Sequence, residues 1–304
     1  MKVLIIGLGS IVKKHINALQ EIDSEIEFIA LRSSRKAIAL ENIKNIYDWG
    51  IIKKKSPDFI IISNPTSLHF NTLQKLKDYS IPLFIEKPLF SEVSEESDCL
   101  VKEISDKGII NYVACNLRFL HCIQKIRNIT KKERINEVNV YCGSFLPDWR
   151  PGVDFRSTYS ANKEMGGGVH IDLIHELDYV FWLFGKPQYT RSFFKNNSSL
   201  EISAVDYANY LWNYKSFTAS IILNYYRKQP RRSLEIICES GTYSIDLLQN
   251  SIIYNGNLIY SSEQRIKDTY KDQMLFFIHR ILTKNEIFNS VEEANNILKL
   301  CLAQ

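Results

Sequence analysis

The stretch Val3-Leu-Ile-Ile-Gly-Leu-Gly-Ser-Ile-Val12 decides how the fold begins. Four apolar residues, Val3–Ile6, form a run typical of a short buried strand, and Gly7 and Gly9 follow at once. Residues 11–22 then place apolar side chains at helical spacing. The sequence therefore predicts a strand, a tight turn and a helix, whose N-terminal N–H groups and positive dipole end suit a pyrophosphate.

Outward from this turn, strand and helix patterns alternate. We expect strands at Ile26–Leu31, Asp58–Ser63, Leu83–Ile85 and Ile109–Cys115, and helices at Thr66–Tyr79 and around Val93–Ile104. The unbroken Phe-Ile-Ile-Ile that begins at Phe59 suits a strand buried on both faces, which implies parallel pairing. The alternation predicts an α/β domain of the Rossmann type, with a doubly wound parallel sheet and helices on both faces.

The second half of the chain has another pattern. A helix is expected around Phe119–Ile129, then alternating apolar residues from Val138 to Cys142, and several β-rich segments between Tyr189 and Tyr260. One strongly patterned helix, Val169–Phe184, interrupts them. We expect a C-terminal α+β domain on a largely antiparallel sheet. Because 304 residues exceed the size at which one core stops growing, we divide the chain into a dinucleotide-binding domain, 1–118, and a substrate-binding and oligomerisation domain, 119–304.

Composition excludes several protein classes. Hydrophobic residues at 45% and charged residues at 24% argue against long disorder, and a net charge of +4 is too weak for a footprint on nucleic acid. The longest apolar runs, Val3–Ile6 and Phe59–Ile62, are too short to span a membrane, and no signal peptide is completed. Six cysteines stand far apart without a C-x-x-C pair, so we expect no metal site, reduced thiols and a cytoplasmic location.

The cofactor fingerprint is incomplete, because Val12 stands where a third glycine is usual. The end of the second strand reads Leu31-Arg-Ser-Ser-Arg35, without the acidic residue that binds a ribose 2′-hydroxyl, which favours NADP over NAD. Arg32 and Arg35 can equally be the solvated start of a helix. Likewise Ser63-Asn-Pro-Thr-Ser-Leu-His69 is a cofactor contact or a simple turn and N-cap.

Two further segments carry chemistry. Glu86-Lys87-Pro88 directly follows a strand, which places the Lys87 ammonium where open α/β sheets bind ligands and can stabilise charge on a substrate oxygen. The alternative is a plain surface Glu-Lys pair before a turn. Gly166-Gly-Gly168 leads into a helix on which Asp172, His175, Glu176 and Tyr179 share one polar face by spacing. A carboxylate beside an imidazole suits proton transfer from an alcohol, although such a pair is more often a plain surface pair.

Together these segments resemble the Gfo/Idh/MocA family of NAD(P)-dependent oxidoreductases along most of the chain. The motifs in family order are Gly7-x-Gly9, Pro65 to His69, Glu86-Lys-Pro88, Cys115-Asn-Leu-Arg-Phe119 and the glycine-led helix. The resemblance implies that Lys87, Asp172 and His175 act on a sugar hydroxyl beside the nicotinamide. Many members space the aspartate and histidine by four residues, whereas here the separation is three. The segment from Ser144 to Tyr159 looks like a subset associated with bacterial surface-sugar synthesis.

This resemblance implies hydride transfer between nicotinamide and a sugar, amino-sugar or nucleotide-sugar carbon, in a cleft between the two domains. Expected cofactor contacts are Gly7, Gly9, Ser10, Ile11, Arg32, Ser33, Arg35, Asn64, Pro65, Thr66, His69, Glu86 and Lys87. Expected substrate contacts are Arg118, Trp149, Arg150, Arg156 and Tyr159. The indole offers a stacking face and the arginines forked donors, or this segment is an ordered loop.

Two other functions stay open at the level of sequence. A redox regulator would bind NADP without turnover, yet it would need neither Lys87 nor His175. A sugar epimerase or eliminase would oxidise its substrate transiently and return the cofactor unchanged. We also expect a homodimer or homotetramer through the C-terminal sheet, because sheets rarely leave a broad apolar face wet.

Overall fold

The computed structural model describes residues 1–36, 40, 42–283 and 288–303, which form two compact units. Unit 1 comprises Met1–Cys115 and Tyr270–Leu298, and unit 2 comprises Asn116–Thr269 and Lys299–Gln304. The first boundary therefore lies at Cys115, close to the position expected from the sequence. The second part of unit 1 differs from the expectation, which placed the whole segment after residue 118 in one domain.

Unit 1 is built on a six-stranded parallel sheet in the order β3-β2-β1-β4-β5-β6. Its strands are β1 Lys2–Ile6, β2 Glu27–Leu31, β3 Ile43–Ile46, β4 Phe59–Ile62, β5 Leu83–Ile85 and β6 Asn111–Val113. All neighbouring pairs are parallel, which confirms the Rossmann fold. The strand order reverses between β1 and β4, the topological switch point at which ligands of such sheets bind. Strand β3 lies in a stretch whose sequence pattern was too weak to predict it.

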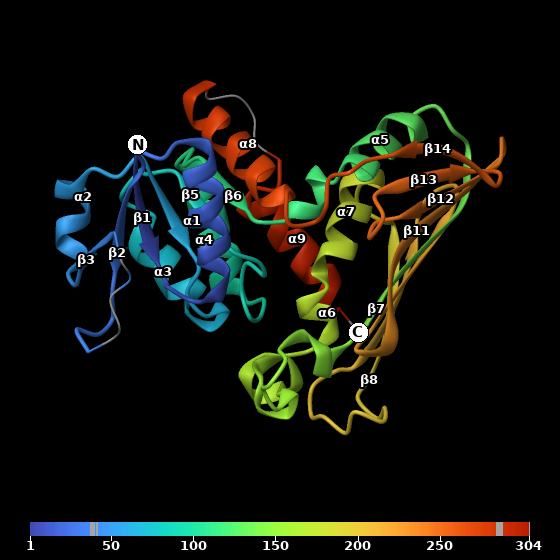
Figure 1. Cartoon of the computed structure of the whole chain (residues 1–304), viewed down its shortest axis with the longest axis horizontal. Coiled ribbons are helices and arrows are strands. Elements are labelled where there is room, and N and C mark those ends of the chain that lie inside the picture. Colours follow the sequence, from blue (N-terminus) through green and yellow to red (C-terminus); the bar gives the residue numbers. More distant parts are fainter. Residues whose placement is uncertain (37–39, 41, 284–287, 304) are drawn as a thin grey trace. The chain divides into compact units, whose positions relative to one another are not determined.

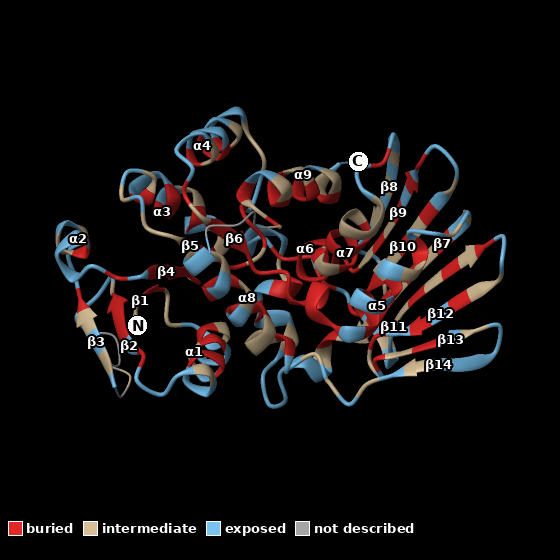
Figure 2. Cartoon of the chain, turned by 90° about the horizontal axis from the view of Figure 1, so that it is seen from above, coloured by how far each residue is buried: buried red, intermediate tan, exposed pale blue. Residues whose placement is uncertain are grey.

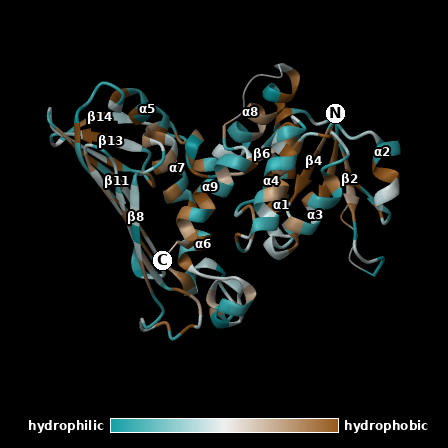
Figure 3. Cartoon of the chain, turned by 180° about the vertical axis from the view of Figure 1, so that it is seen from behind, coloured by the Kyte–Doolittle hydropathy of each residue, from teal (hydrophilic) through white to brown (hydrophobic). Residues whose placement is uncertain are grey.

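Helices cover both faces of this sheet. They are α1 Ser10–Ile22, α2 Ile52–Lys55, α3 His69–Leu76, α4 Glu95–Asp106, α8 Thr269–Thr283 and α9 Val291–Leu302. Figure 2 shows α3 and α4 on one side of the sheet and α1 and α8 on the other. All four residues of β4 are fully buried, and Figure 3 colours this strand as hydrophobic. Burial on both faces explains why its sequence is an unbroken apolar run rather than an alternating one.

Aromatic packing brings α8 into unit 1. The ring of Phe277 meets Phe59 of β4 and Phe84 of β5, with centroids 5.3 and 5.5 Å apart. Farther along, the Asn289 side chain donates to the carbonyl of Val113 at 2.7 Å. The helical period of residues 269–283 shows that one face is apolar, but it does not say which sheet that face covers. This is why the sequence misassigned the segment.

Unit 2 contains an eight-stranded sheet in the order β14-β13-β12-β11-β7-β10-β9-β8. The strands are β7 Ile135–Phe145, β8 Tyr189–Lys195, β9 Tyr207–Asn213, β10 Thr218–Asn224, β11 Tyr226–Cys238, β12 Thr242–Asp246, β13 Ser251–Tyr254 and β14 Asn257–Ser261. Every pair is antiparallel except β7 with β10. Figure 1 shows α5 (His121–Thr130) and α7 (Ile174–Phe184) along one face. The expected α+β domain is thus confirmed.

The predicted helix Val169–Phe184 is divided in two. Helix α6, Val169–Asp172, ends at Leu173, whose φ of −101° and ψ of 29° leave the helical region, and α7 begins at Ile174. Both pieces lie in unit 2. Among the residues described, none of the helices is long and apolar enough to cross a membrane.

Candidate active site

The turn after β1 has the geometry of a phosphate cradle. Gly7 has a φ of +103°, and a Cβ atom there would lie 2.2 Å from the backbone nitrogen of Asn64. Only glycine fits this approach between the ends of β1 and β4. Gly9 then caps α1, where no side chain can compete for the first N–H groups, and the first turn carries no acidic residue. The backbone therefore offers donors to a pyrophosphate, and the residues present fit a dinucleotide.

Val12 fills the place of the missing third glycine. Its side chain is fully buried on the face of α1 that packs against the sheet, together with His15, Ala18 and Leu19. The valine therefore contributes to the contact between helix and sheet, while the turn at Gly7 keeps its close approach. The departure from the usual fingerprint leaves the strand, turn and helix intact.

Cationic side chains gather at the end of β2. A guanidinium nitrogen of Arg32 donates to the Asn45 side chain at 3.3 Å, and the guanidinium of Arg35 stacks over the ring of Tyr47 at 5.1 Å. Ser33 between them is exposed. Two guanidinium groups and a hydroxyl therefore stand where a ribose-binding carboxylate is usual in such folds.

His69 joins the segments that follow β4 and β5. Its Nε2 lies 3.0 Å from the carbonyl oxygen of Asn64, and its Nδ1 lies 3.1 Å from the carbonyl oxygens of Pro88 and Leu89. Burial lowers the pKa of His69, against the smaller opposing effect of these bonds. The predicted cofactor residues Asn64 and His69 are thus brought together, with His69 holding the loops in place from the interior.

Glu86 and Lys87 follow β5 directly. The Glu86 carboxylate is buried and lies 2.5 Å from Nε2 of His15, on α1, and it also accepts the backbone N–H of Lys87 at 3.2 Å. The half-buried Lys87 therefore stands on a backbone fixed by its neighbour. No sequence motif indicates a partner for His15, because α1 and the end of β5 are far apart in the chain.

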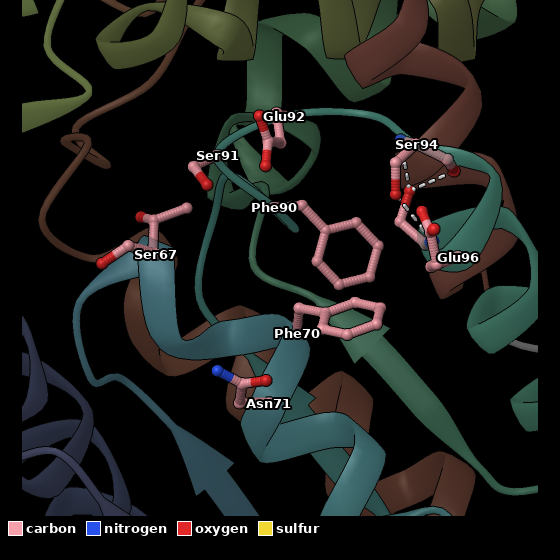
Figure 4. Close-up of a pocket in the computed structure, with 10 residues that line it drawn as sticks. Ser67, Phe70, Asn71, Phe90, Ser91, Glu92, Ser94 and Glu96 are labelled. Carbon is pink, nitrogen blue, oxygen red and sulfur yellow. Dashed lines mark hydrogen bonds between the residues drawn. The ribbon is translucent and has the colours of Figure 1, made fainter. Parts of the chain in front are cut away.

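A pocket of about 300 Å³ opens beside these loops in unit 1. Its lining comes from the start of α3 and from the segment that leads into α4. Figure 4 shows Phe70 and Phe90 close together, with Ser67, Ser91 and Glu92 around them, and the two rings lie 6.1 Å apart in an edge-to-face arrangement. Thr66 also lines this pocket, so one predicted cofactor contact faces it.

In unit 2, Asp172 lies at the centre of a polar cluster. The Tyr159 hydroxyl donates to one of its carboxylate oxygens, and the Tyr225 hydroxyl donates to the other at 2.5 Å. Burial, followed by the charge of Asp172, raises the pKa of both phenols, which keeps them protonated as donors. Both carboxylate oxygens of Asp172 therefore accept hydrogen bonds from phenols, which orient the carboxylate.

Aromatic and cationic side chains surround this cluster. The ring of Trp149 meets the ring of Tyr225 edge to face at 5.3 Å, and its indole N–H donates to the Ser144 hydroxyl at 3.0 Å. Trp149 is 38% exposed, so part of its ring remains open for stacking. The Arg150 guanidinium lies over the Tyr159 ring at 5.6 Å. Three predicted substrate residues, Trp149, Arg150 and Tyr159, thus gather around Asp172.

Other candidates lie elsewhere. Arg156 is exposed and stacks over its neighbour Phe155. Arg118 is fully buried, and its Nε and Nη2 donate to the two oxygens of Asp178 at 2.8 and 2.7 Å. This fork binds α7 to the segment before α5, so we interpret Arg118 as structural rather than as a substrate contact.

The expected polar helix face is only partly present. His175 is half-buried, but Glu176 and Tyr179 are fully buried. Glu176 accepts two hydrogen bonds from Arg232 of β11, at 2.6 and 3.0 Å. The prediction of one polar helix face from the residue spacing was wrong here. The helix breaks at Leu173, and a strand of the sheet, β11, supplies Arg232 as a partner for the buried Glu176.

The glycines before α6 serve the chain itself. A Cβ on Gly167 would lie 1.9 Å from the carbonyl oxygen of Tyr159, and Gly168 has a φ of +144° against the ring of His170. Gly167 therefore approaches the segment that carries Tyr159, and Gly168 makes room for the His170 ring. Tyr225 was missed by the sequence analysis, because no motif marks it and only the pairing of β10 with β7 and β9 places it here.

Comparison with known proteins places these features in a family. Residues 1–114 match a family model described as an oxidoreductase family with NAD-binding Rossmann fold, and residues 123–244 match the GFO/IDH/MocA C-terminal domain. An uncharacterised oxidoreductase of Bacillus subtilis (strain 168), YrbE, is 22% identical over 307 residues, covering 93% of this chain and 86% of that protein.

Solved structures agree with this fold. UDP-N-acetylglucosamine 3-dehydrogenase GnnA from Acidithiobacillus ferrooxidans superposes with a TM-score of 0.79 at 18% identity, over 99% of this chain and 95% of that one. The scyllo-inositol dehydrogenase from Lactobacillus casei, with bound NAD(H) and scyllo-inositol, also gives 0.79, at 17% identity over 100% and 95%. With both halves of the chain matched in order, the protein belongs to the Gfo/Idh/MocA family of NAD-binding oxidoreductases.

Proposed function

We propose that the protein transfers a hydride between the nicotinamide of NADP(H) and a carbinol or keto carbon of a sugar or sugar derivative. The cluster of Trp149, Tyr159, Asp172 and Tyr225 carries the proposal. An open indole face, beside a carboxylate that two phenols hold in place, suits a polyhydroxylated ring. The relatives named above include enzymes that act on a nucleotide sugar and on an inositol.

Each side chain of the proposed machinery has one task. His175 exchanges the proton of the substrate hydroxyl, and Asp172 orients the groups around it. Lys87 polarises the substrate oxygen, so that negative charge can develop there. The bound dinucleotide supplies the hydride chemistry. The cations Arg32 and Arg35 at the end of β2 support NADP rather than NAD, and Arg150 at the cluster supports a substrate with an anionic group.

The test is an assay of purified protein with a panel of sugars, nucleotide sugars and their keto forms. Absorbance of the reduced cofactor is followed with NADPH and with NADH, and the product mass is measured. We expect net oxidation of NADPH by a keto sugar, with NADH the poorer donor. Tight NADPH binding with no net or redox-neutral conversion of any panel member would contradict the proposal. A product formed without net cofactor change would assign the epimerase or eliminase alternative instead.

We also propose that the enzyme is cytoplasmic and associates with a second copy of itself through the outer face of the eight-stranded sheet. Six free cysteines, five of them buried, are suited to a reducing compartment.

The proposed self-association rests on exposed apolar side chains of the eight-stranded sheet. They project from β8 and β9 with 72%, 56% and 47% of their surface exposed and are Tyr189, Phe193 and Leu211. The test is the mass in solution: we expect a dimer or tetramer, weakened in Phe193→Asp, and a monomer at micromolar concentration would contradict the proposal.

A further inference from the structure

His15 is a buried, polar residue whose function none of the motifs above explains. It lies in the second turn of α1, fully buried, on the helix face that packs against the sheet. Its ring meets Phe84 edge to face at 5.0 Å and Tyr270 at 5.7 Å. A histidine in such an apolar setting loses its hydration. The free-energy cost of this desolvation is offset by a hydrogen bond to another buried polar side chain.

That contact is the Glu86 carboxylate. His15 Nε2 and Glu86 Oε1 are 2.5 Å apart, and Glu86 is only 8% exposed. The other carboxylate oxygen accepts the backbone N–H of Lys87 at 3.2 Å. The Glu86 backbone N–H donates to Ile62 at the end of β4 at 2.8 Å. Glu86 therefore connects α1 and the Lys87 peptide through its carboxylate, and it contacts the end of β4 through its backbone N–H.

We propose that His15 is a positioning residue, which acts through Glu86 to fix the backbone from which the Lys87 side chain extends. The same contact ties the helix that follows the phosphate turn to the loop of the proposed electrophile. A buried carboxylate that lost its donor would be free to turn, and the Lys87 peptide would then lose its acceptor. A misplacement of a catalytic group by about 1 Å can lower a rate about 100-fold, so the position of the Lys87 backbone matters for turnover.

The inference rests on the proposed function in one respect, namely that Lys87 acts on the substrate. The first variant is His15→Phe, which keeps a ring among Phe84 and Tyr270 but removes the donor to Glu86. We expect kcat to fall about 10- to 100-fold with the KM for NADPH nearly unchanged. His15→Gln, whose side-chain amide can donate to Glu86, should recover kcat to within about threefold of the wild type.

Two controls separate positioning from general loss of stability. Leu19→Ala also removes buried atoms from α1 but does not touch Glu86, so its kcat should stay near that of the wild type at a temperature where both proteins are folded. In a Lys87→Ala background, His15→Phe should produce almost no further loss, because the two residues act on one element. Independent, additive losses, or an equal loss in Leu19→Ala, would overturn the proposal.

A second readout does not depend on turnover. Hydrogen exchange of the Lys87 backbone amide should accelerate about tenfold or more in His15→Phe and return toward the wild-type rate in His15→Gln. If the wild type converts no sugar, the proposed function fails while this measurement still decides the inference. Unchanged exchange at Lys87 in a folded His15→Phe protein would overturn it. If His15→Phe fails to fold, the exchange rate of the Lys87 backbone amide is compared between the wild type and Glu86→Gln, in which the acceptor is neutral. Unchanged exchange in that variant would also overturn the proposal.

Discussion

Proton exchange with the substrate hydroxyl is assigned to one side chain, that of His175. We expect His175→Ala to lower kcat about 10²- to 10⁴-fold, the usual contribution of a general acid or base. The KM for NADPH should change little, because cofactor binding is assigned to unit 1. His121→Ala is the matched control, since His121 also lies in unit 2 but hydrogen-bonds to Ser262 on the surface. The kcat values of the two variants are measured by steady-state kinetics. Equal kcat values would contradict the role of His175 in proton exchange.

A second residue, His170, makes stability depend on pH. Burial lowers its pKa from the usual 6.5 to about 4, against the weaker effect of Asp172. The unfolded chain therefore binds a proton near pH 6.5 that the folded protein binds only near pH 4, so this contribution to stability is complete above pH 6.5 and is lost as the pH falls. At pH 5 the loss is about 2 kcal/mol.

His170→Phe tests this, because a phenyl ring can keep the stacking on Phe194, whose centroid is 5.0 Å from that of His170. The free energy of unfolding in urea is measured for both proteins at pH 7.5 and pH 5. We expect the variant to lose about 2 kcal/mol less than the wild type over this interval. Parallel losses in the two proteins would show that carboxylates, and not His170, set the acid sensitivity.

Single residues also show the limits of sequence analysis. Gly7 and Gly9 were identified because a strand, a turn and a helix are contiguous in the chain. The same holds for Lys87, which follows a strand directly. Tyr225 and His15 were missed because their partners, Asp172 and Glu86, lie 53 and 71 residues away, and no local pattern encodes a contact of that range.

At the level of elements, buried ion pairs attach α7 to its surroundings. Arg118 and Asp178 are both almost completely buried and bind each other through two hydrogen bonds. We expect Asp178→Ala to lower the free energy of unfolding by about 3–5 kcal/mol, because it removes the carboxylate that pairs with a buried guanidinium. Replacing both residues, as Arg118→Met with Asp178→Leu, should cost far less. Urea unfolding of the two variants makes the comparison, and equal losses would contradict the explanation.

The division between α6 and α7 explains an unusual spacing. The apolar stripe predicted one helix with a polar opposite face, whereas Glu176 and Tyr179 of that expected polar face are fully buried. The stripe gave no sign of the break at Leu173, because a single non-helical residue hardly disturbs a pattern of three and four. Asp172 is the last residue of α6 and His175 lies in α7, so the two residues do not share one continuous helix.

For the molecule as a whole, the decisive feature is the discontinuous first unit. The parallel direction in unit 1 and the largely antiparallel direction in unit 2 followed from the alternation of patterns, but the strand order and the return of residues 270–298 to unit 1 did not. We expect a fragment of residues 1–115 to lack a cooperative thermal transition, because Phe59 and Phe84 lose the cover of Phe277. Joining residues 270–298 to it through a flexible linker should restore the transition, followed by circular dichroism. Cooperative unfolding of the short fragment would contradict this.

This discontinuity has a consequence for synthesis on the ribosome. The strands of the nucleotide-binding sheet are translated before unit 2, yet the helix that covers β4 and β5 is translated only after most of unit 2. The apolar surfaces of β4 and β5 therefore stay uncovered while unit 2 is being made. During that interval the strands of unit 1 are the part of the nascent chain that needs chaperone protection most.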